Sequence, residues 1–158
     1  GHILEKYNYE WIEEPLQDYD IFGLQTLCKA VDLPVLALEW IGAIGGQPFN
    51  AAPYVALGAT DIVRQRGIGI TGQLKVAQMA ESMGVPVHGG EPHVILGVSN
   101  EPLFEAFMGL QPEPPEEEQD CRGQLVVGDG VARIAWSDRP VVEPDWDEVA
   151  RSALMVIE

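Results

Sequence analysis

The sequence predicts an α/β fold in which short parallel strands alternate with helices. Short apolar segments rich in β-branched residues recur along the first two thirds of the 158-residue chain, and helix-like segments separate them. The first two apolar segments each end in a glutamate, Glu13 and Glu39. Alternation of this kind is typical of consecutive βα units, and a parallel barrel presents the residues at its strand ends to its mouth. The two acids therefore indicate a metal-dependent enzyme.

Two βα units are expected before residue 60. Strands are predicted over 9–13 and 35–39, and a helix over 20–31 lies between them. A second, short helix follows Asn50, since Pro53 is tolerable only in the first turn of a helix. The apolar face of the first helix comprises Ile21, Leu24, Leu27 and Val31.

The remaining units are expected between residues 58 and 107. Gly58 ends the preceding helix and introduces a strand over 60–63. Thr71 caps a helix that runs to about Met83, where Gly84 stops it. The pattern then predicts, in order, a strand over 85–88, a short helix over 92–98 and a fifth strand over 103–107.

Polar residues at the ends of these strands are expected to lie at one rim. The carboxyl ends of parallel strands share the edge of the sheet where ligands bind in α/β proteins. Five such residues are therefore expected to gather there: Glu13, Glu39, Arg64, His88 and Glu105.

The chain changes character after Leu110. Residues 111–122 are rich in proline and glutamate and are predicted to form an exposed acidic linker. Beyond it, segments 124–127 and 131–136 flank Gly-Asp-Gly and predict a β-hairpin, and 145–157 predicts an amphipathic helix. Residues 1–110 are thus interpreted as a partial barrel. Residues 123–158 are interpreted as a hairpin and a C-terminal helix that pack on this barrel.

Composition narrows the classes of partner. A formal charge of -16 argues against nucleic acid or an anionic membrane surface as a partner. No segment approaches the roughly 20 apolar residues of a membrane span, and no signal-peptide pattern opens the sequence, so a cytoplasmic location is expected. Cys28 and Cys121 have no metal-ligand spacing and are interpreted as free thiols.

Several motifs in order resemble one known family. Five motifs follow one another along the chain: Trp-Ile-Glu-Glu-Pro at 11–15, Pro-Val-x-x-x-Glu at 34–39, Gly-Ala-x-Asp-Ile-Val at 58–63, Gly-Ile-Thr-Gly at 69–72 and Gly-Val-Pro-Val-His at 84–88. The chain resembles the enolase superfamily, in the branch of mandelate racemase, muconate lactonizing enzyme and the acid-sugar dehydratases. The resemblance covers about residues 7–110 and implies the C-terminal portion of a (β/α) barrel, with about five βα-type units.

The resemblance implies a Mg²⁺ ion held by three carboxylates. Glu13 matches the second metal ligand and Glu39 the third. Hard oxygen ligands suit Mg²⁺, which leaves positions for a substrate carboxylate and water. From the residues alone, Glu13 could also be a strand-end acid that caps a helix, and the adjacent Glu14 could be the ligand instead.

The resemblance also implies acid-base residues and a substrate. His88 matches the family's histidine acid/base and Glu105 an acid that hydrogen-bonds a developing oxyanion; Arg64 and His93 are the expected substrate contacts. A sugar acid would lose the proton α to its carboxylate and then its β-hydroxyl. The alternatives left open by the residues are a loop role for His88, a structural role for His93 and a buried, paired Glu105.

Two departures from the family leave the function open. The first three strands, the first metal ligand and the lysine base are absent, so a homo-oligomer or a complementing N-terminal half is expected. Arg66 stands near the place of an aspartate that orients the histidine, and its charge would lower the histidine pKa. A Mg²⁺-dependent dehydratase, an inactive fragment or remnant, and a racemase or epimerase on the same scaffold are the three hypotheses.

Overall fold

The computed structural model describes residues 1–43, 48–66, 69–103, 105, 125–128, 131–134, 147, 150 and 151. The chain divides into two units, Gly1–Ala106 and Phe107–Glu158. The expected linker 111–122 lies outside the described residues, as does most of the expected C-terminal helix. The packing of 123–158 on the barrel stays a prediction.

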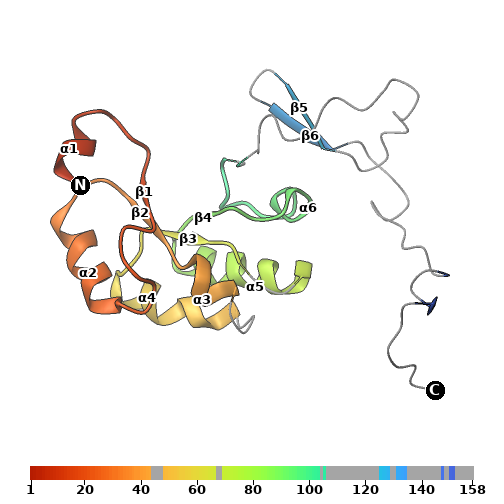
Figure 1. Cartoon of the computed structure of the whole chain (residues 1–158), viewed down its shortest axis with the longest axis horizontal. Helices are drawn as coiled ribbons and strands as arrows, with labels where there is room; N and C mark the ends of the chain where they lie inside the picture. Colours follow the sequence, from red (N-terminus) through yellow and green to blue (C-terminus); the bar gives the residue numbers. More distant parts are fainter. Residues whose placement is uncertain are drawn as a thin grey trace. The chain divides into compact units, whose positions relative to one another are not determined.

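The first unit is built on a four-stranded parallel sheet (Figure 1). Its strands lie in chain order: β1 (Ile12–Glu13), β2 (Val35–Ala37), β3 (Ile62–Arg64) and β4 (Val87–His88). Strands that pair in sequence order, with helices α2, α4 and α5 together on one side (Figure 1), form a singly wound arrangement. This arrangement is that of a segment of a barrel, because a doubly wound sheet carries helices on both faces.

The helices start and stop close to where the sequence predicts. Asp20 caps α2 (Ile21–Ala30) by accepting a hydrogen bond from the Gly23 N–H at 2.9 Å. The helix α4 (Ala52–Leu57) ends at Gly58, whose φ of 64° is the left-handed conformation that glycine adopts readily. Shorter helices complete this unit: α1 (His2–Glu5), α3 (Glu39–Ala43), the 3-10 turn η1 (Pro48–Ala51) and α6 (Pro92–Ile95).

Several predicted boundaries are wrong. The helix expected from Thr71 is α5 (Gly69–Ser82), so Thr71 lies inside it and is no cap. The first strand is shorter than predicted, since only Ile12 and Glu13 pair with β2. Leu103 and Glu105 lie outside any strand, and the rest of the fifth strand predicted over 103–107 falls outside the described residues.

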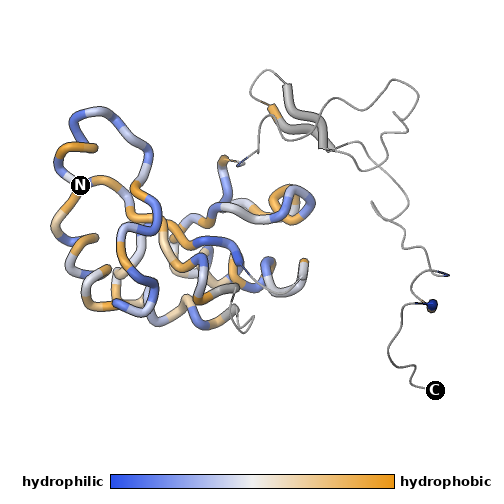
Figure 2. Tube along the Cα trace, viewed as in Figure 1, coloured by the Kyte–Doolittle hydropathy of each residue, from blue (hydrophilic) through white to orange (hydrophobic). Residues whose placement is uncertain are grey.

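The core lies between the sheet and the helices on that side. Figure 2 shows hydrophobic residues gathered along the strands and on the neighbouring helices. All three residues of β2 are buried, and Val35 and Ala37 belong to one core cluster with the fully buried Leu24 of α2 and Ala80 of α5. Burial on both faces is typical of parallel strands. The strand ends are thereby anchored in a packed core.

The second unit contains a described pair of strands. β5 (Leu125–Gly128) pairs with β6 (Val131–Ile134) in antiparallel register, with Gly128 opposite Val131. β6 lies within the predicted segment 131–136, and β5 extends one residue beyond the predicted 124–127, to Gly128. In the described part of the chain, no helix is long and apolar enough to cross a bilayer.

Candidate active site

Arg64 lies at the centre of a cluster of charged side chains at the strand ends. Its guanidinium is 3.0 Å from Glu13 (Nη2 to Oε1), 3.4 Å from Glu39 (Nε to Oε2) and 2.9 Å from Glu105 (Nη1 to Oε2). The arginine is 5% exposed. Burial alone lowers the pKa of Arg64, but the carboxylates of Glu13, Glu105 and Glu39 raise it overall, so the charge stays in place.

His88 lies directly beside Arg64, since the two residues are opposite each other in the register of β3 and β4. Its Nε2 is 3.8 Å from Glu105 Oε2, and its ring packs against Trp11 with centroids 4.8 Å apart. Burial lowers the pKa of His88, and the charge of Arg64 lowers it further against the opposing effect of Glu105 and Glu13. The His88 imidazole is therefore mostly uncharged at neutral pH.

The second arginine, Arg66, contacts Glu39 and the backbone beside His88. Arg66 Nη2 pairs with Glu39 Oε1 at 2.6 Å, and Nη1 donates to the Gly89 carbonyl at 3.4 Å. The positive charge that lowers the pKa of His88 is that of Arg64. The expectation for Arg66 is wrong in this respect, because the strand register brings Arg64 to the histidine.

Glu39 belongs to a helix and not to the end of a strand, which corrects the strand predicted over 35–39. β2 ends at Ala37, and Leu38 turns the chain with a φ of 83°, a strained value for a residue with a side chain. Glu39 is then the first residue of α3. The turn aims its carboxylate at the two arginines.

Two acids from the loop after β1 hold this turn in place. Asp18, buried, accepts hydrogen bonds from the N–H groups of Leu38 at 3.2 Å, Trp40 at 2.7 Å and Ile41 at 2.9 Å. Glu14 accepts one from the Glu39 N–H at 3.1 Å. These are the free donors of a helix N-terminus, which acids satisfy well. Sequence reasoning missed Asp18, because nothing in its spacing shows which later segment it caps.

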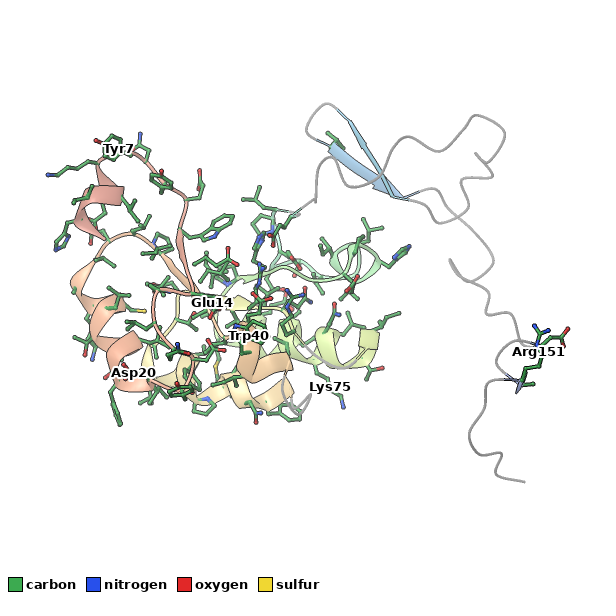
Figure 3. The ribbon with its side chains drawn as sticks, viewed as in Figure 1. Tyr7, Glu14, Asp20, Trp40, Lys75 and Arg151 are labelled. Carbon is green, nitrogen blue, oxygen red and sulfur yellow. The ribbon has the colours of Figure 1, made fainter. Side chains whose placement is uncertain are left out.

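Glu13 and Glu14 therefore face different partners. Glu14, labelled in Figure 3 near Trp40, adopts a φ of 45° and turns toward the start of α3, whereas Glu13 contacts Arg64. This geometry favours Glu13 over Glu14 as the carboxylate of the cluster. The metal-binding role of Glu13 stays a prediction.

Glu14 is expected to make the stability of the metal-free protein depend on pH. Burial, and then a hydrogen bond with Asp18, raise its pKa from 4.5 to about 7. The folded state thus binds this proton more tightly than the unfolded chain. The contribution of the protonated Glu14 to the free energy of unfolding is therefore present below pH 4.5 and is lost as the pH rises through about 7. Glu14→Gln should be more stable than wild type by about 1 kcal/mol at pH 8. Urea unfolding should show this advantage shrinking toward pH 5, and the exposed Glu10→Gln is the matched control. An advantage that does not vary with pH would contradict the assignment.

The backbone after His88 makes room for Arg64. Gly89 has a φ of 80°, and a Cβ there would lie 2.7 Å from Arg64 Nη1 and 2.9 Å from Cζ. The next residue, Gly90, donates its N–H to the buried Glu101 at 3.1 Å. The loop after β4 is thus shaped around the guanidinium.

Gly89→Ala is expected to lower the free energy of unfolding by about 2 kcal/mol, from left-handed strain and from displacement of Arg64. Gly84→Ala is a matched control, because Gly84 has a φ of 75° and a methyl group there would meet nothing within 4 Å. The control should lose only the strain, about 1 kcal/mol. Equal losses in thermal or urea unfolding would show that Arg64 tolerates the methyl group.

Glu13 and Glu39 fit a hard divalent cation in chemistry and charge. Both carboxylates contact the Arg64 guanidinium, and three glutamates with two arginines and a neutral His88 leave a formal charge of −1. Within the described residues no group of three His, Cys, Asp or Glu side chains could hold a metal ion. Among the described residues, Glu13 and Glu39 are thus two candidate carboxylate ligands, and the Arg64 guanidinium lies between them.

The other predicted site residues stay expectations. His93 is exposed in α6, and its substrate-binding role, like that of Arg64, is untested by the geometry. Cys28 is a free thiol, and burial, then Asp61, raise its pKa to about 12. Cys121 lies outside the described residues.

The fold and the site define an α/β protein of the parallel-barrel class with acidic and basic groups at its strand ends. Residues 1–140 match the family described as Enolase C-terminal domain-like. The chain belongs to the enolase superfamily and corresponds to its C-terminal domain, as the sequence motifs predicted.

The relatives include several sugar-acid dehydratases. L-talarate/galactarate dehydratase of Salmonella typhimurium is 32% identical over 138 residues, which are 82% of this chain and 33% of that protein. Among solved structures, D-glucarate dehydratase of Agrobacterium tumefaciens complexed with magnesium has a TM-score of 0.54 at 32% identity and covers 61% of this chain and 27% of that one. L-talarate dehydratase of Polaromonas sp. JS666 complexed with Mg and L-glucarate has a TM-score of 0.53 at 30% identity, over 63% and 28%. The chain spans about a third of the length of these relatives, and the superfamily uses magnesium.

Proposed function

We propose that this chain forms part of the catalytic barrel of a magnesium-dependent lyase that dehydrates a sugar acid. The observation that carries the proposal is the cluster itself: a neutral, buried histidine lies beside three glutamates and an arginine at the ends of parallel strands. The relatives named for talarate, galactarate and glucarate dehydration support the class of substrate.

Magnesium would be held by Glu13 and Glu39, together with a third ligand from outside these 158 residues. Bound there, the ion would supply positive charge to the substrate carboxylate and so make the α-hydrogen more acidic. Because the chain spans about a third of its relatives' length, we propose that the remaining strands come from further residues of the same protein or from a complementing chain.

His88 would move the proton in both steps of the reaction. Its neutral imidazole takes the α-proton as the α C–H bond breaks, and the electron pair forms a C=C bond as the β C–O bond breaks. The imidazolium then returns that proton to the departing hydroxyl, which leaves as water. The resulting enol tautomerises: its O–H proton is lost to solvent as the β-carbon gains a proton, which gives a 2-keto-3-deoxy acid. Glu105, 3.8 Å from His88 Nε2, would stabilise the transient imidazolium.

A protein that keeps the fold without turnover is the second candidate. The observation that favours it is the position of Arg64, whose guanidinium lies between the two carboxylates that would hold the metal ion.

A racemase or epimerase would share the first proton transfer and differ only in the fate of the carbanion.

Turnover of a panel of sugar acids tests the proposal. The protein that contains this chain should convert at least one of them to a 2-keto-3-deoxy acid in the presence of Mg²⁺. Glu39→Gln should abolish the conversion, whereas Glu10→Gln, an exposed acid outside the cluster, should leave it unchanged. Unchanged turnover by Glu39→Gln would exclude the mechanism, and absence of turnover in a folded, magnesium-bound protein would favour the second candidate.

A further inference from the structure

Arg64 holds three carboxylates with three different nitrogen atoms. Nη2 faces Glu13, Nε faces Glu39 and Nη1 faces Glu105, at 3.0, 3.4 and 2.9 Å. The glutamates come from three separate segments: the end of β1, the start of α3 and the chain after β4. The guanidinium therefore lies where the carboxylates of these segments converge.

The fit of the guanidinium to this position is imperfect. Arg64 Nε is buried and makes no hydrogen bond, although Glu39 Oε2 lies 3.4 Å away. A guanidinium binds carboxylates best in a bidentate fork, with two parallel N–H donors to one partner. Here each carboxylate faces one nitrogen. A planar guanidinium that meets each carboxylate through a single nitrogen is therefore a poor match to all three.

Arg64 neutralises part of the negative charge of the carboxylates around it. Glu13, Glu39 and Glu105 would repel one another if Arg64 were absent, and Arg66 reaches Glu39 alone among the three. Arg64 is tethered to β3 and stays charged under all ordinary conditions. It thus provides the neutralising charge that a bound metal ion would otherwise provide.

We infer that Arg64 is an internal cation that competes with a divalent metal ion for Glu13 and Glu39. The inference rests on the metal site of the proposed function and concerns how metal binding at that site is regulated. The guanidinium occupies the site in the metal-free protein, and it must release both carboxylates before a metal ion binds them. Glu105 remains as an anionic partner for the displaced guanidinium.

Because of this competition, the wild-type protein should bind metal ions weakly, and a variant without the guanidinium should bind them tightly. Removing one competing positive charge from the centre of three carboxylates should raise the affinity for Mg²⁺ and Mn²⁺ at least tenfold. Arg66→Met removes the same charge from the same cluster but leaves Arg64 between Glu13 and Glu39. Because Arg66 contacts Glu39 but not Glu13, its removal frees one of the two carboxylates at most, and the affinity should rise less than threefold.

Calorimetric titration of wild type, Arg64→Met and Arg66→Met with MgCl₂ and MnCl₂ tests the inference. Tighter binding by Arg64→Met alone is the expected result, and its loss in Arg64→Met combined with Glu39→Gln assigns the gain to this site. Binding by Arg64→Met that is no tighter than wild type, or an equal gain in Arg66→Met, would overturn it.

A measurement on wild type keeps the test valid if Arg64→Met does not fold. The Nε–H signal of Arg64 can be followed by NMR during a titration with MgCl₂. It should shift and exchange faster with water as the site fills, and an unchanged signal at saturation would overturn the inference. Sugar-acid turnover separates this inference from the proposed function. If Arg64→Met binds metal ions tightly but the magnesium-bound wild type does not turn over a sugar acid, the competition is supported and the proposed lyase activity is wrong.

Discussion

Arg64→Met is expected to lower the free energy of unfolding of the metal-free protein by about 3 kcal/mol. The substitution keeps an unbranched apolar side chain and removes the guanidinium, with its charge and its N–H donors. Three carboxylates that the guanidinium now neutralises would be left facing one another without a cation between them. The partly exposed positions of the glutamates place the loss at the lower end of the range for a broken buried ion pair. Urea unfolding at pH 7 with a chelator present measures it.

The control for this prediction is Arg66→Met. Arg66 is a third exposed and pairs with Glu39 alone among the three glutamates, so its removal should cost about 1 kcal/mol or less. Added Mg²⁺ should restore part of the stability of Arg64→Met, since a ligand that binds the folded state stabilises it. An Arg64→Met variant as stable as wild type without metal would show that the cluster does not need the guanidinium.

His88→Gln is expected to lower kcat for sugar-acid dehydration about 10³-fold, the usual scale for loss of a general acid-base group. Glutamine retains a polar side chain at the position but cannot take a proton. The measurement is the initial rate of 2-keto-3-deoxy acid formation by the protein that contains this chain. His2→Gln, at an exposed histidine of α1, is the matched control and should keep the wild-type rate.

The affinity for Mg²⁺ separates a chemical role of His88 from a structural one. Because His88 does not contact Glu13 or Glu39 directly, His88→Gln should bind Mg²⁺ as wild type does while its rate falls. A variant that retains the wild-type rate would show that another group moves the proton.

The sequence predicts the parallel strands, their order and the polar residues that end them. Glu13, Arg64 and His88 end their strands as expected. This much is accessible because apolar runs and helix caps are local signals.

The arrangement around Glu39 and Arg64 depends on contacts between distant segments. The strand that was expected to reach Glu39 stops at Ala37, because Asp18 and Glu14 bind the N–H groups that follow it and start a helix there. Arg64 reaches His88 through a register that strands of two and three residues do not reveal in the sequence. Pattern reasoning therefore assigned to Arg66 the effect on the histidine that Arg64 has.

The turnover of a sugar acid deuterated at the α-carbon tests the central claim, that the cluster removes the proton next to a carboxylate. The protein that contains this chain should process the deuterated substrate more slowly than the protiated one when Mg²⁺ is present. The deuteron should be lost from the α-carbon, which becomes the ketone of the product. Turnover that is equally fast for both substrates, or a product that retains deuterium at that carbon, would contradict the account.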